Sequence, residues 1–150
     1  MSIKTLTIIF SLLFSSLFAA GSSDDNSVKT NYSKDFKTAI MLIRSNDFEL
    51  AIRKLKTLVT AASLEFSRAD VYNELGFAYR KTGDFENASK YYKKALKLEP
   101  NHLGAIEYQG EMYVDLEQKD NALNNLEILK NLVGENNPYY KELDFYISRN

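Results

Sequence analysis

Apolar side chains recur at helical intervals through the middle of the chain. Tyr72, Leu75 and Tyr79 are spaced i, i+3 and i+7, which predicts a helix over about residues 68–81 with one buried face. A comparable stripe predicts a second helix over about residues 85–98, and its members are Tyr91, Tyr92, Ala95 and Leu98. Only a short turn separates the two stretches, so we expect an antiparallel helix pair.

The expected ends of these helices carry residues that suit helix ends. Ser67 and Asp70 have the spacing of a capping box at the start of the first helix. Gly83 can take the left-handed conformation that ends this helix, and Asp84 can cap the next one. Pro100 cannot continue the second helix, which we therefore expect to stop just before it.

Residues 69–102 resemble one complete tetratricopeptide (TPR) repeat, a unit of two antiparallel helices. The residues that carry the resemblance are Tyr72, Leu75, Gly76, Tyr79, Ala88, Tyr92, Ala95 and Pro100. We expect Gly76 and Ala88 to meet where the two helix backbones come closest. The resemblance implies a surface on which other proteins dock, and no enzymatic activity.

Two further repeats are expected, because one repeat cannot bury its own apolar faces. A shift of one repeat length places Gly110, Tyr113 and Ala122 at pattern positions of a repeat at about 103–136. Residues 46–51 echo residues 83–88 and indicate a weaker repeat at about 32–68. The last stretch, 137–150, starts near Pro138 and is periodic again, as in a capping helix. The sequence thus predicts an all-α TPR solenoid with three helix-turn-helix repeats over 32–136 and a C-terminal capping helix.

Residues 1–21 have the layout of a secretory signal peptide. Lys4 precedes an apolar run over residues 6–20, and cleavage after Gly21 would place Ala19 and Gly21 at the small-residue sites. An uncleaved anchor that faces the periplasm is the alternative, because a run of about 18 uncharged residues can span a bilayer. We expect cleavage, a flexible leader at 22–31, and a bacterial periplasmic or secreted location without stable membrane insertion.

Composition leaves little catalytic chemistry. The chain has no cysteine, which excludes thiol catalysis and thiolate metal sites. Its single histidine, His102, follows Pro100 at a turn between repeats, where a turn or capping role is expected. We expect no cofactor. The near balance of 19 basic and 20 acidic residues argues against nucleic acid as a partner. A cluster on the second helix of the central repeat is expected to be a solvated face, and its members are Lys90, Lys93, Lys94 and Lys97.

The TPR resemblance also implies a concave groove lined by the first helix of each repeat. Carried over position by position, the partner-binding residues are expected to be Asp70, Asn73, Phe77, Arg80, Glu107 and Glu111. Phe77 is the sharpest candidate, because an aromatic exposed in a cleft can anchor a partner. Packing of Phe77 against the turn at residues 40–43 is the alternative. Glu107 and Glu111 stand one helical turn apart and could act as paired carboxylates, although an exposed acidic face is the simpler interpretation.

The segment 107–111, Glu-Tyr-Gln-Gly-Glu, is similar to a helix of small exported bacterial TPR proteins. Together these features predict a periplasmic adaptor or scaffold that binds a protein or peptide in its groove. The alternative is a self-associating structural module of a cell-envelope complex, in which the aromatic-rich last helix is completed by another copy.

Overall fold

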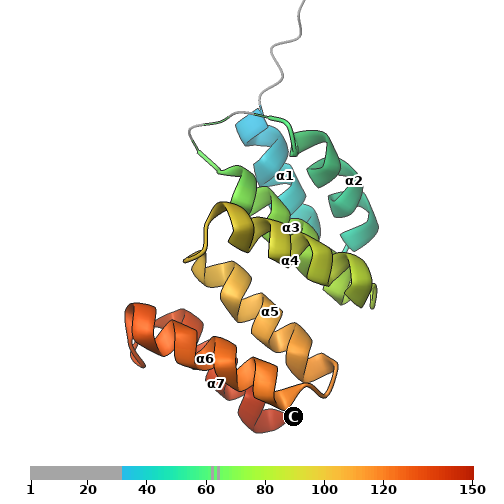
Figure 1. Cartoon of the computed structure of the whole chain (residues 1–150). Helices are drawn as coiled ribbons and strands as arrows, with labels where there is room; N and C mark the ends of the chain where they lie inside the picture. The colour runs from blue at the N-terminus through green and yellow to red at the C-terminus, as the bar shows by residue number, and fades with distance from the viewer. Residues whose placement is uncertain (1–31, 62, 64) are drawn as a thin grey trace, which may run out of the picture.

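The computed structural model describes residues 32–61, 63 and 65–150, and within them the chain is entirely helical apart from turns and connections (Figure 1). The helices are α1 Tyr32–Arg44, α2 Phe48–Leu58, α3 Arg68–Lys81, α4 Phe85–Leu98, α5 Leu103–Asp115, α6 Lys119–Val133 and α7 Pro138–Arg149. The expected signal segment 1–21 and leader 22–31 lie outside the described residues. None of the described helices is long and apolar enough to cross a bilayer.

Consecutive helices pack as three antiparallel pairs, α1 with α2, α3 with α4 and α5 with α6 (Figure 1). The first helices also contact one another along the stack, α1 with α3 and α3 with α5. α7 packs on both α5 and α6, the place that the first helix of a further repeat would take. The prediction of an all-α solenoid with three helix pairs and a capping helix is confirmed.

The predicted caps of the central pair are present. The Ser67 hydroxyl accepts a hydrogen bond from the Asp70 N–H at 3.0 Å, and the Asp70 carboxylate accepts one from the Ser67 N–H at 2.6 Å. Asp84 caps α4 by accepting from the Asn87 N–H at 3.0 Å. α4 ends at Leu98, just before the proline. These local bonds explain why α3 and α4 begin and end where the sequence predicts.

The turn inside each pair has the same backbone geometry. Asn46, Gly83 and Glu117 take left-handed conformations, with φ of 61°, 81° and 60°. In the central pair, the N–H of the next residue, Asp84, donates to the Tyr79 carbonyl at 3.0 Å. Equivalent bonds join residue 47 to 42 and residue 118 to 113. The same turn thus closes each of the three helix pairs.

Close approach at Gly76 makes room for an aromatic ring. The sequence predicts that Ala88 meets Gly76. A Cβ at Gly76 would lie 2.6 Å from two ring carbons of Tyr92, so the side chain packed most closely on Gly76 is that of Tyr92. Ala88 is itself fully buried in the same cluster. Gly110 has the equivalent role in α5, where Leu143 of α7 fills the space at 2.6 Å. Glycine thus lets a large side chain from another helix pack directly on the backbone.

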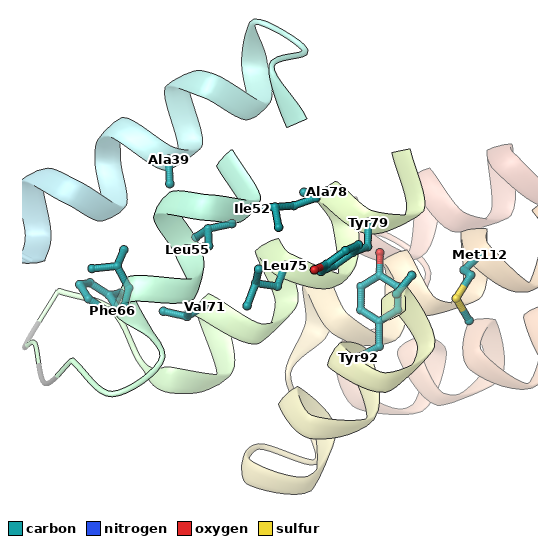
Figure 2. Packing of buried hydrophobic residues seen from close by; sticks show 12 residues of the cluster. Ala39, Ile52, Leu55, Phe66, Val71, Leu75, Ala78, Tyr79, Tyr92 and Met112 are labelled. Atoms are coloured by element: carbon teal, nitrogen blue, oxygen red, sulfur yellow. The ribbon is translucent and has the colours of Figure 1, made fainter. Parts of the chain in front are cut away.

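Buried residues of the first two pairs form one continuous core that includes Tyr92 and, from α5, Met112 (Figure 2). The connection between α2 and α3 also contributes to it. Phe66 is buried there and stacks on Phe36 of α1, with ring centroids 4.6 Å apart. The connection between α2 and α3 therefore adds an aromatic contact to the core.

We predict that Gly76→Ala lowers the free energy of unfolding by about 1–3 kcal/mol, because the fully buried Tyr92 ring has no room to move aside. Urea unfolding of the two proteins measures this loss. In a double-mutant cycle, Gly76→Ala combined with Tyr92→Leu should cost less than the sum of the single changes, since leucine vacates the space that the new methyl needs. Strictly additive costs would contradict the assignment of the contact to Tyr92.

Candidate partner-binding groove

A cavity of about 510 Å³ opens between α1, α3 and α5, on the side of the solenoid formed by the first helices. It is lined by Ile40, Ile43, Arg44, Asn46, Phe48, Glu74, Phe77, Lys81 and Tyr108. The lining thus combines an apolar and aromatic floor with charged groups at the edge.

Phe77 lies at the centre of the aromatic part of this cavity. Its ring centroid is 4.7 Å from that of Tyr108 on α5 and 6.4 Å from that of Phe48 on α2. The ring is half-buried and shares the cavity with Ile40 and Ile43 of α1. Phe77 therefore lies beside the turn of α1 that the sequence offered as a packing partner, and it also faces the cavity.

Charged residues surround the aromatic floor. Arg44 and Lys81 are exposed at the cavity edge, and the Lys81 ammonium lies 6.0 Å from the Phe77 ring centroid. Burial raises the pKa of Glu74 to about 7, while an Asn73 amide that donates to its Oε1 at 3.1 Å opposes this shift. Near neutral pH a large fraction of the Glu74 carboxyl is protonated and can donate a hydrogen bond.

The sequence did not single out Glu74, Lys81 or Tyr108 as groove residues. Glu74, Phe77 and Lys81 are spaced i, i+3 and i+7, so they share one face of α3. Tyr108 follows Glu74 by one repeat length and occupies the equivalent place in α5. The helical neighbours of Phe77 were the signal that could have identified this face.

Arg80 lies one helical turn after Phe77, with its guanidinium carbon 5.6 Å from the Phe77 ring centroid, and the guanidinium is enclosed between helices. It pairs with the Glu111 carboxylate, donates to Asp115 at 2.8 Å, and is only 3% exposed. The Tyr146 hydroxyl of α7 donates to Asp115 at 2.6 Å, and the Tyr146 ring centroid lies 5.6 Å from the guanidinium carbon. Arg80 and Glu111, both predicted to contact a partner, are thus engaged with each other and tie α3, α5 and α7 together.

Glu107 is buried beside this cluster, with 6% of its surface exposed. Burial raises the pKa of Glu107 to about 8, and the nearby carboxylates of Glu111 and Glu142 raise it further. Burial also raises the pKa of Glu111, against the attraction of Arg80. The expected carboxylate pair therefore consists of one neutral acid and one ion-paired acid, and neither is on an exposed acidic face as the sequence indicated.

The remaining predicted groove residues, Asp70 and Asn73, lie near the start of α5. His102 caps α5, because its Nδ1 accepts from the Ala105 N–H at 3.1 Å and its Nε2 lies 3.1 Å from Asp70 Oδ1. This confirms the capping role expected for His102, with the proton on Nε2. Asn73 is 4% exposed, and its Oδ1 accepts no hydrogen bond from a described residue.

Within the part of the chain that the structure describes, no three histidine, aspartate or glutamate side chains are arranged to hold an ion. What the groove offers chemically is an aromatic cavity for an apolar group, two exposed cations and a carboxyl that can donate.

The raised pKa of Glu107 predicts a pH-dependent stability. Between its ordinary value of 4.5 and about 8, the folded protein holds a proton that the unfolded chain releases. This contribution to the free energy of unfolding is therefore largest at low pH and is lost as the pH rises through about 8. Glu107→Gln should remove this part of the decline and be more stable than the wild type above that pH.

Urea unfolding over a pH series measures the effect. The matched control is Glu127→Gln, at an exposed glutamate on α6, which should keep the wild-type pH dependence. If Glu107→Gln and the wild type lose stability with the same slope, Glu107 is not held neutral by the fold.

Comparison with known proteins agrees with this architecture. Residues 69–102 match the family model described as tetratricopeptide repeat. No curated protein matches the chain. The P58(IPK) TPR domain has a similar structure, with a TM-score of 0.65 and 20% identity, over 79% of this chain and 33% of that one. This chain thus spans about a third of that protein's length.

A second similar structure is that of PcrH in complex with the chaperone binding region of PopB. Its TM-score is 0.65 at 14% identity, and the match covers 81% of this chain and 94% of PcrH. At such low identities the likeness shows the fold alone. The chain therefore contains a tetratricopeptide repeat at residues 69–102, and its described helices have the fold of a TPR domain.

Proposed function

We propose that this chain is a protein-interaction module that binds a segment of another protein in the groove formed by its first helices. The observation that carries the proposal is the cavity of about 510 Å³ around Phe77, which is already open without a partner. A cavity of this size with an aromatic floor suits one or two large apolar side chains. Affinity then comes from burying those side chains without first reorganising the groove.

The charges around the cavity indicate the flanking chemistry of the partner. Arg44 and Lys81 are the exposed charges of the edge, and Glu74 is partly neutral near pH 7. A carboxylate next to the apolar anchor would meet both cations, whereas a lysine or arginine would be repelled. We therefore expect a segment with a bulky apolar residue next to an aspartate or glutamate.

Arg80, Glu111 and Glu107 support the groove instead of contacting the partner. Their burial means that substitutions there would act through folding, so they are unsuitable as tests of binding. Phe77, half-buried with one side toward the cavity, remains the anchor site. The complex of PcrH with a region of PopB supports the view that this kind of fold can hold such a segment.

The setting that we propose is the bacterial periplasm, and the role is non-catalytic. The support for this location is the signal-like segment at residues 1–21. The typical role of TPR domains as docking surfaces favours a scaffold or adaptor over an enzyme.

Self-association is the second candidate, favoured by the apolar side chains that α6 and α7 expose. These are Leu123, Ile128, Leu132, Tyr139 and Phe145. A second copy that covered them would extend the solenoid from its C-terminal end.

Site-specific photo-crosslinking separates the two candidates. A photoreactive residue replaces Tyr108 in the cavity, and the matched control replaces Phe145, which is 55% exposed on α7. We expect a discrete crosslink to a different protein from position 108 only. Phe77→Ala should weaken that crosslink, since loss of a central aromatic anchor costs about 2 kcal/mol or more, roughly 30-fold in affinity. Phe145→Ala should leave the crosslink unchanged.

Unfolding curves of each variant show that the helices remain folded under the assay conditions. Equal crosslinking at both positions, or a crosslink at position 108 that Phe77→Ala does not reduce, contradicts binding in the cavity. A crosslinked dimer of this chain from position 145 supports self-association.

A further inference from the structure

Three lysine side chains lie over three tyrosine rings where α3 packs against α2 and α4; of these rings, Tyr72 and Tyr91 are half-buried and Tyr79 is buried. Tyr91 of α4 stacks on Tyr79 of α3, with ring centroids 5.5 Å apart and planes 6° from parallel. Tyr72, one end of the series, lies 5.9 Å from Tyr91. The Lys94 ammonium lies 5.3 Å from the ring centroid of Tyr72 and 5.2 Å from that of Tyr91. Lys56 lies over Tyr79, and Lys90 lies over Tyr91. We call this surface the lysine–tyrosine face.

The positive charge of this face extends along both helices. α2 and α4 together contain seven basic and two acidic residues, whereas α5 contains three acidic and no basic ones. Lys54 is paired with Asp35. The other lysines of the two helices form no ion pair with any residue that the structure describes, and they are Lys56, Lys90, Lys93, Lys94 and Lys97.

This arrangement is unfavourable for the isolated protein. Lys90 and Lys94, and likewise Lys93 and Lys97, are one helical turn apart, and like charges at that spacing repel. The tyrosine rings offset part of the repulsion through their negative faces. A ligand with many negative charges would relieve the rest.

The shape of the face favours a surface over a peptide. Of these lysines, none lines the cavity around Phe77, and the four lysines of α4 are spread along about 10 Å of the helix. A peptide needs a groove or an open strand edge that holds its backbone. A bilayer needs only a broad cationic face, and the half-buried Tyr72 and Tyr91 suit the boundary between water and lipid because a tyrosine ring is apolar and its hydroxyl polar.

From these observations we infer that the lysine–tyrosine face docks reversibly on anionic phospholipid, which would hold the domain at a membrane while the groove stays free. Each basic residue near such a surface strengthens binding by about fivefold. The contact would weaken as salt is raised, because the charges involved are exposed. This inference is independent of what the groove binds.

Co-sedimentation of the full chain with lipid vesicles tests the inference. The measured quantity is the ratio of the partition coefficient for vesicles that contain phosphatidylglycerol to that for pure phosphatidylcholine vesicles. This ratio isolates the charge-dependent part, since the apolar run at residues 6–20 can enter both kinds of vesicle. We expect a ratio well above one that falls toward one at high salt.

The variant Lys93→Gln/Lys97→Gln should lower the ratio roughly 25-fold, or to one if the wild-type ratio is smaller. Glutamine keeps the helix propensity, and thermal unfolding checks that the fold is unchanged. The matched control, Lys119→Gln/Lys141→Gln, removes two exposed charges from α6 and α7 and should reduce the ratio much less. Three results would overturn the inference. The wild-type ratio could be one, or the control variant could lose as much as Lys93→Gln/Lys97→Gln. Polyglutamate, at the same charge concentration as phosphatidylglycerol, could also displace the protein from the vesicles.

Discussion

The guanidinium of Arg80 links α3 to α5 and, through shared partners, to α7. Its partners, Glu111 and Asp115, are on α5, and Tyr146 reaches the same cluster from α7. Enclosing this charge is costly, so two carboxylates, a tyrosine hydroxyl and a ring face must compensate it together. α7 contacts α5 and α6, and this cluster holds it together with Leu143 in the space above Gly110 and the buried Ile147.

The same cluster determines which part of the groove is open. At the C-terminal end, Arg80 and its partners fill the space between the first helices, and the neutral Glu107 lies beside them. Toward the N-terminal end, Phe36 of α1 stacks on Phe66 of the α2–α3 connection, and the cavity around Phe77 remains. The two ends of the groove therefore differ. The ion-paired cluster around Arg80, which we call the interlock, fills one end, and the aromatic cavity around Phe77 is open at the other.

Local signals in the sequence were enough for the helices of the central repeat. The capping box at Ser67, the left-handed Gly83 and the proline after α4 act over a few residues, so they can be recognised without the fold. The groove was harder to predict. Carrying the groove positions of TPR repeats over to this sequence selected Asn73 and Arg80. Their side chains are buried because α5 and α7 cover them.

The interlock depends on residues 31 and 35 positions apart, close to one repeat length. No local sequence pattern predicts that Arg80 pairs with Glu111 and Asp115. Comparing charges at equivalent places of neighbouring repeats would have suggested it, since a cation on one first helix faces anions on the next. Gly76 shows the same limit, because the pattern required a small residue there and only the packing identified Tyr92 as its neighbour.

Hydrogen exchange of Arg80→Ala tests the central claim most directly. Removing the guanidinium leaves two carboxylates without their cation, so we expect the free energy of unfolding to fall by about 3 kcal/mol. The amides of α7 should lose protection before those of α2 and α4. The control Lys37→Ala breaks the exposed pair with Glu65 and should cost no more than about 0.5 kcal/mol. Unchanged protection of α7 in Arg80→Ala would contradict the view that this cluster ties α7 to α3 and α5.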